Sequence, residues 1–108
     1  MEIKNASDGF AAIAQPTRLE ALRLLVRAGP QGVTAGALAT ALDVAAPTLT
    51  FHLKELTRAN LASARRSGRS VYYAANYGGL RQLIDFLMAE CCQGDPRLCG
   101  PYVVKEAI

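Results

Sequence analysis

Three cysteines near the carboxyl end are the residues best suited to chemistry in this sequence. Cys91 and Cys92 are adjacent and Cys99 follows, so the three thiols fall within nine residues. An odd number of clustered cysteines, in a chain whose residues 1–6 show no secretory signal, argues against a disulfide framework and predicts reduced thiols. A disulfide between neighbouring cysteines would close a strained ring, whereas two adjacent thiolates can bind one soft ion from two sides.

Positive charge is concentrated in one short part of the chain. The net charge is +3, and residues 54–73 contain five basic residues and one acidic residue, while the rest of the chain is almost balanced. A local basic patch on a nearly neutral protein suggests a polyanionic partner, of which nucleic acid is the commonest. On charge alone, a solvated basic hairpin explains the patch equally well.

The first sixty residues are expected to be mainly helical, and two of the helices are short and closely connected. The expected helices are 5–14 (beginning near Ser7 or Asp8), 16–28 (with Leu19, Leu22, Leu25 and Val26 on its apolar side), 35–42 (capped by Thr34) and about 45–59 (capped by Asp43). The last two predict a helix-turn-helix.

The following residues predict a β-hairpin and a final helix. The expected strands are 61–65 and 70–75, with Gly68 in the turn, and the helix runs from about residue 79 to 91. Its apolar stripe consists of Leu80, Leu83, Ile84, Leu87 and Met88. Phe86 lies off that stripe, so the helix needs two apolar contacts, one of which we expect to be a second subunit meeting the first and last helices.

The fourth helix has an outward face that suits a DNA groove. At about 100° per residue, Leu49, Leu53 and Leu56 point inward. On the outward arc, Phe51 suits a thymine methyl group and Thr50 a base edge, whereas Lys54 and Arg58 are better placed for phosphates. His52 lies between the faces, as a boundary residue or a phosphate contact rather than a metal ligand. The candidate DNA-binding residues of this helix are Pro47, Thr48, Thr50, Phe51, His52, Lys54 and Arg58.

Three arginines surround the expected hairpin turn. Arg65, Arg66 and Arg69 flank a Ser-Gly tip. Arginines on a projecting turn can enter the minor groove, where the negative potential is strong. The alternative is that they only keep an exposed hairpin soluble.

The order helix, helix, helix-turn-helix, basic hairpin, helix resembles the ArsR/SmtB family of winged-helix metal-sensing repressors. The resemblance covers about residues 10–88, and its most specific pieces are residues 16–25, 46–56 and 65–73. It implies a mainly α fold with a small β-hairpin, a winged helix-turn-helix that dimerises through its first and last helices. It also implies a homodimer that binds palindromic double-stranded operator DNA and leaves it when an inducer binds.

Members of this family place their sensor sites in different parts of the scaffold, so the resemblance alone does not locate the site in this sequence. The Cys-x-Cys cluster of the best-known arsenic site is absent from residues 38–44, and the final helix offers Asp85 and Glu90 without a histidine for a zinc site. The remaining segment, 90–100, is similar to arsenic-responsive repressors with carboxy-terminal cysteines. This likeness implies that Cys91, Cys92 and Cys99 bind As(III), or Sb(III), through three thiolates, with no required cofactor. Zinc would normally want a fourth ligand. Cadmium, lead or copper binding, thiol oxidation, and no function at all remain alternatives for these thiols.

Several function classes are disfavoured by what the sequence lacks. No stretch approaches the roughly 20 apolar residues that span a bilayer, so we expect a cytoplasmic protein with no membrane partner. One histidine and scattered carboxylates form no catalytic constellation, so we expect no enzyme. Residues 1–108 are expected to form one domain, with 91–108 as an inducer-binding tail. A winged helix that binds protein instead of DNA would show no salt-dependent DNA affinity.

Overall fold

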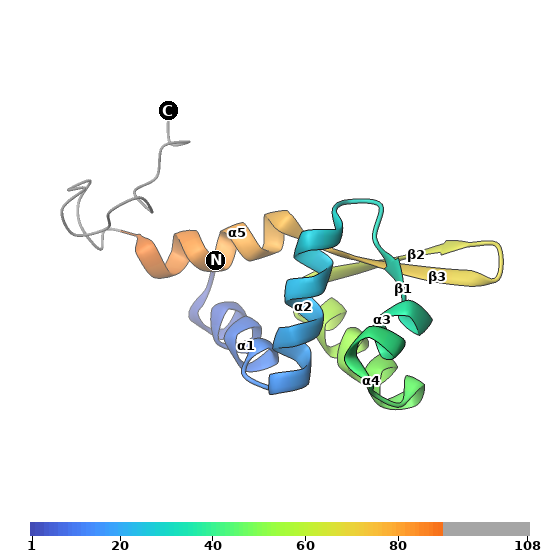
Figure 1. The fold of residues 1–108 in the computed structure, drawn as a ribbon. Helices are drawn as coiled ribbons and strands as arrows, with labels where there is room; N and C mark the ends of the chain where they lie inside the picture. The colour runs from blue at the N-terminus through green and yellow to red at the C-terminus, as the bar shows by residue number, and fades with distance from the viewer. Residues whose placement is uncertain (90–108) are drawn as a thin grey trace.

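Five helices and a three-stranded sheet make up residues 1–89, the part of the chain that this computed structural model describes (Figure 1). The elements are α1 (Ile3–Ile13), α2 (Pro16–Ala28), β1 (Val33–Thr34), α3 (Ala35–Leu42), α4 (Ala46–Arg58), β2 (Ala62–Ser67), β3 (Ser70–Ala75) and α5 (Tyr77–Met88). The expected class, a mainly helical winged helix-turn-helix, is confirmed. The predicted tail with Cys91, Cys92 and Cys99 lies outside the described residues.

Side-chain caps explain where several helices begin. Pro16 occupies the first turn of α2, and the Gln15 side chain accepts a hydrogen bond from the Arg18 N–H at 2.8 Å. Thr34 caps α3 as predicted, accepting from the Ala37 N–H. Asn76, which was not predicted as a cap, accepts from the Gly79 N–H and starts α5.

The predicted role of Asp43 was wrong. Asp43 has a left-handed backbone with φ of 55° and ends α3, while α4 begins after Ala45 without a side-chain cap. Aspartate is among the few residues that tolerate the left-handed conformation, and this conformation lets its N–H bond back to the last carbonyls of α3.

The first helix begins four residues before Ser7, which corrects the expected start. Its buried stripe consists of Ala6, Gly9 and Ala12. A Cβ atom added to Gly9 would lie 2.8 Å from the Leu83 side chain, so the small residues allow α1 to approach α5 closely. Alanine and glycine give weak hydrophobic periodicity, which is why the first turn of α1 was missed.

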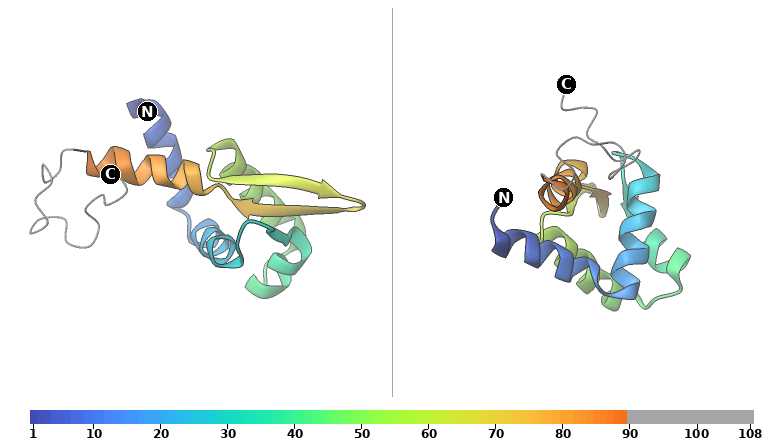
Figure 2. Two further views of the ribbon diagram at one scale, coloured as in Figure 1. Left: turned by 90° about the horizontal axis from the view of Figure 1, so that it is seen from above. Right: turned by 90° about the vertical axis from the view of Figure 1, so that its left-hand side faces the viewer.

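The sheet has the order β1-β3-β2 and is antiparallel. The predicted hairpin is present but its first strand extends to Ser67, which pairs with Ser70 and leaves a two-residue turn. β1 was not predicted; Val33 pairs with Tyr73 and attaches the hairpin to the helical body. The hairpin projects from one end of the molecule and α5 from the other (Figure 2).

The core lies where α2, α3 and α4 meet the base of the hairpin. Its largest fully buried side chains are Leu25, Leu38, Leu49, Leu53, Leu56 and Leu61. Leu22 is buried as expected, but Leu19 and Val26 of the same predicted stripe are exposed. No helix within residues 1–89 is long and apolar enough to cross a membrane.

The apolar residues of α5 divide between two faces, as predicted, but the residues on each face differ from the prediction. Leu83 is buried, and Leu80 and Phe86 pack against the same core. Ile84 and Leu87 remain 55% and 63% exposed. Phe86 therefore belongs to the core-facing side of α5, whereas part of the predicted stripe faces outward.

Candidate nucleic-acid interface

Helix α4 is buried along one face and exposed along the other. Leu49, Leu53 and Leu56 have no exposed surface, which confirms the predicted inward side. Phe51, on the opposite side, is 54% exposed, although burial of a phenylalanine ring would lower the free energy of the protein. The structure leaves Pro47, Thr48 and Lys54 exposed and Thr50 half-buried along the same helix. An exposed aromatic ring among short polar and basic side chains suits the edges of DNA bases and their phosphates.

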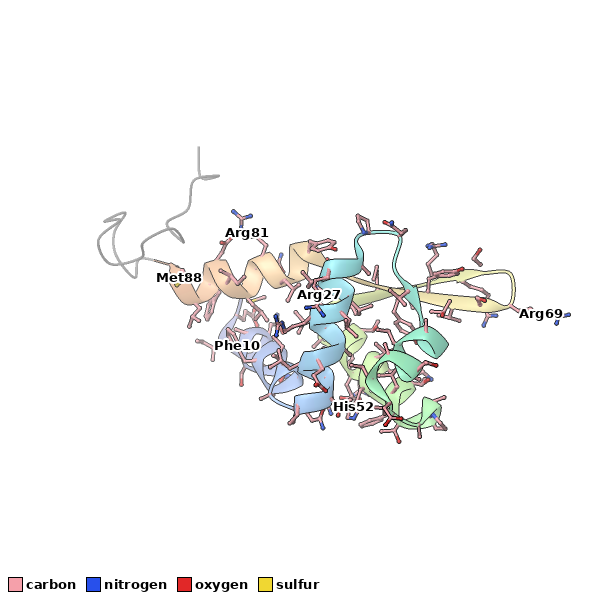
Figure 3. The ribbon with its side chains drawn as sticks, viewed as in Figure 1. Phe10, Arg27, His52, Arg69, Arg81 and Met88 are labelled. Atoms are coloured by element: carbon pink, nitrogen blue, oxygen red, sulfur yellow. The ribbon has the colours of Figure 1, made fainter. Side chains whose placement is uncertain are left out.

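His52 lies at the contact between α2 and α4 rather than on the open face (Figure 3). The side chain is only 8% exposed, and its Nδ1 atom accepts a hydrogen bond from Arg18 Nε at 3.1 Å. Burial lowers the pKa of His52 below its ordinary value of 6.5, the Arg18 charge lowers it further, and Glu55 partly opposes both effects. His52 is therefore more buried than the boundary position expected for it.

Phe51 is held by the same neighbours. Its ring centroid lies 5.5 Å from that of His52 in an edge arrangement, and the Arg18 guanidinium carbon lies 5.8 Å from the Phe51 centroid. Arg18 was not predicted as a functional residue. No spacing within the sequence connects it with His52, which lies thirty-four positions away.

The three arginines of the hairpin have different surroundings. Arg65 Nη2 donates to the Gln31 carbonyl at 2.8 Å, and the guanidinium carbon lies 4.8 Å from the Tyr72 ring centroid. Arg65 therefore links the hairpin to the loop before β1. Arg66 and Arg69 are exposed, and Arg69 extends from the hairpin tip (Figure 3).

Arg58 lies at the end of α4, one turn beyond the candidate Lys54. It is the last residue of α4, two turns beyond Phe51, and its Nη2 atom pairs with Glu55 Oε2 at 2.8 Å. The side chain lines a hollow of about 280 Å³ between α1, α4 and α5, which also contains Asp8 and Gly79.

A second exposed surface consists of apolar side chains on α1 and α5. Ile3 and Phe10 of α1 and Ile84 and Leu87 of α5 are exposed. These helices lie at the end of the molecule opposite the hairpin tip (Figure 1). Within residues 1–89, no group of three or more His, Cys, Asp and Glu side chains could hold a metal ion.

Comparisons with known proteins agree with this geometry. A family model described as a helix-turn-helix domain matches residues 13–63. The transcriptional repressor SdpR of Bacillus subtilis (strain 168) is 34% identical over 86 residues, which cover 80% of this chain and 92% of SdpR. An ArsR-like transcriptional regulator from Rhodococcus sp. RHA1 has a solved structure with a TM-score of 0.74 and 30% identity, covering 89% of this chain and 88% of its own. The chain belongs to the ArsR family of winged-helix transcriptional repressors.

Two further solved structures are similar to this ArsR-family chain. One is the homodimeric winged helix-turn-helix DNA-binding domain of Mb0332 from Mycobacterium bovis, with 26% identity, a TM-score of 0.67 and coverage of 82% of this chain and 81% of its own. The other is described as a possible transcriptional regulator for arsenical resistance, with 31% identity, a TM-score of 0.68 and coverage of 77% and 83%. The ArsR relatives are transcriptional regulators, in agreement with the expectation that the chain is not an enzyme.

Proposed function

We propose that this ArsR-family chain is a homodimeric repressor that binds a palindromic operator and leaves it when a trivalent metalloid binds its carboxy-terminal thiols. The observation that carries the DNA-binding part is the exposed Phe51 ring on a helix whose other face is fully buried. An apolar side chain such as Phe51, which is exposed to water on a well-packed helix, is suited to contact with a partner molecule. The basic hairpin beside it supplies charge for a polyanion.

The contacts divide according to the surroundings of each residue. On this proposal Thr48, Thr50 and Phe51 read base edges in the major groove, and Pro47 and Lys54 lie against the backbone. The exposed Arg66 and Arg69 enter the adjacent minor groove.

The candidate residues whose side chains already bond to other groups of the protein have mainly supporting roles. Arg65 is bonded to Gln31 and so holds the hairpin, and His52 is bonded to Arg18 and so holds Phe51. Arg58, paired with Glu55 at the far end of α4, contributes least to DNA contact.

The dimer follows from the exposed apolar residues of α1 and α5. Ile3, Ile84 and Leu87 are more than half exposed on two neighbouring helices, and the similar Mb0332 domain is homodimeric. Covering these side chains with a symmetry-related copy removes them from water. Binding to a palindromic operator then requires the two recognition helices to lie about 34 Å apart, the spacing of successive major grooves.

The inducer site consists of Cys91, Cys92 and Cys99, which follow α5 in the sequence. Three thiolates match the pyramidal coordination of As(III) or Sb(III). The similarity to a possible regulator for arsenical resistance supports this choice. Because these thiols come directly after the dimer helix, metalloid binding would act on subunit geometry, with a coupling of about 1–3 kcal/mol against operator affinity.

The test is a fluorescence-anisotropy titration of reduced protein on an operator duplex selected from random sequences. Arsenite and antimonite should release wild type, and Cys92→Ser should bind DNA equally well but not respond. Cadmium, lead, copper and hydrogen peroxide are added separately, because release by one of these instead would replace the metalloid with another soft ion or with thiol oxidation. Loss of DNA binding in Cys92→Ser would make the cysteines structural and contradict the sensor.

A further inference from the structure

Arg18 lies where the dimer helix α1, the helix α2 and the recognition helix α4 meet. Its backbone N–H is fixed by the Gln15 side chain, its Nε donates to His52 of α4, and its Nη1 lies 3.4 Å from the Ala12 carbonyl in the last turn of α1. The same guanidinium approaches the Phe51 ring. One side chain therefore contacts two helices other than its own.

The hydrogen bond between Arg18 and His52 fixes the protonation state of the imidazole. An arginine side chain can only donate, so Nδ1 of His52 must carry a free lone pair. Neutral His52 then carries its proton on Nε2. The hydrogen bond also fixes the orientation of the imidazole ring. The edge contact of that ring with Phe51 depends on this orientation.

We infer that Arg18 is the positioning residue of the recognition helix: it holds neutral His52 and, with it, the Phe51 ring, and connects both to the end of α1. This inference rests on the proposed function in one respect, namely that Phe51 contacts DNA. It gives the dimer helix a direct connection to the reading side chain, since a shift of the last turn of α1 moves the Ala12 carbonyl against Arg18.

Protonation of His52 disrupts this arrangement. An imidazolium has no acceptor for Arg18 Nε and places a second positive charge beside the guanidinium. The charged groups near this pair are Glu55 of α4, which acts on His52, and Asp8 of α1 and Arg58 of α4, which line the same hollow as Arg18. Operator affinity should therefore fall on acidification, although the net charge of the protein becomes more positive.

The experiment compares wild type with Arg18→Lys, His52→Asn and the control Arg23→Lys, a matched change at an exposed arginine of α2. Arg18→Lys should weaken operator binding by roughly tenfold, the size of one charge-assisted hydrogen bond, because lysine cannot reproduce the planar fork. In His52→Asn the amide oxygen takes the place of Nδ1 without titrating. This variant lacks the imidazole ring that contacts Phe51, so it should bind more weakly than wild type at neutral pH, but its affinity should not decline further on acidification. In wild type the decline lies below the ordinary histidine pKa of 6.5, because burial lowers the pKa of folded His52. Arg23→Lys should match wild type at every pH.

An independent readout is the ¹⁵N chemical shift of the two ring nitrogens of His52 in the wild-type dimer without DNA. The expected spectrum is that of the Nε2–H tautomer with an unprotonated Nδ1. A protonated Nδ1 at neutral pH would overturn the inference, and so would equal operator affinity of Arg18→Lys and wild type. Failure of wild type to bind any duplex would instead contradict the proposed function, while the nitrogen shifts would still decide the role of Arg18.

Discussion

Replacing both Ile84 and Leu87 with alanine should dissociate the dimer. These side chains are 55% and 63% exposed on α5, and alanine keeps the helix intact because it is the best helix former. Complete burial of such a side chain contributes about 1.5–3 kcal/mol, so with roughly half of each still exposed about 1 kcal/mol remains to be gained at an interface. In a two-fold symmetric dimer each of these two side chains occurs twice in the interface, which gives four contributions. The double variant therefore loses about 4 kcal/mol, equivalent to a roughly 1,000-fold weaker dimer.

Sedimentation equilibrium over a range of protein concentrations measures the dimer dissociation constant directly. The matched control is Leu19→Ala with Val26→Ala, which removes two exposed apolar side chains from α2. The control should dimerise as wild type does. An unchanged dissociation constant in the α5 variant, or an equal loss in both double variants, would refute the assignment of the interface to α1 and α5.

Three further predictions concern the first turn of α5, the protonation of His52 and the phosphate contacts of Lys54. Gly79→Ala should lower the free energy of unfolding by about 1–3 kcal/mol in urea titrations, because the added Cβ would collide with the Asn60 carbonyl. In the control Gly36→Ala the added Cβ has no atom near it, so this substitution should stabilise α3. Because the pKa of His52 is lowered in the folded protein, the unfolded state binds the proton more readily as the pH falls. The free energy of unfolding should therefore be highest above the ordinary pKa of 6.5 and should decrease as the pH drops below it. In urea titrations at several pH values, His52→Asn should lack that part of the pH dependence. Lys54→Ala should reduce the slope of log affinity against log salt by about 1 for each subunit, or about 2 for the dimer, and should weaken specific and nonspecific duplexes alike. An unchanged slope would remove Lys54 from the phosphate contacts.

The sequence predicted the elements whose signals are local and strong. The bounds of α2 and α3, the Thr34 cap and the second hairpin strand all follow from residues adjacent in the chain. The inward face of α4 followed from helical spacing, because its three leucines have no competing apolar neighbours except Phe51.

Features that depend on contacts between distant residues could not be predicted in this way. β1 is a strand only because Val33 meets Tyr73, and two residues carry no periodicity of their own. The partial burial of Phe86 depends on how α5 packs against the core. Among the candidate site residues, His52 is more buried than its predicted place between the faces, because its partner Arg18 belongs to another helix and has no spacing signal.

The most direct test of the account is an anisotropy titration of wild type and Phe51→Ala on a selected palindromic duplex and on a shuffled duplex of equal length. Wild type should prefer the palindrome by at least about 1,000-fold, the lower end of the range for specific DNA-binding proteins. Phe51→Ala should lose about 1–3 kcal/mol for each half-site of the palindrome and little on the shuffled duplex, since a base contact affects only the specific complex. Equal affinity of the two proteins for the palindrome, or binding that does not depend on salt, would contradict the claim that α4 reads DNA.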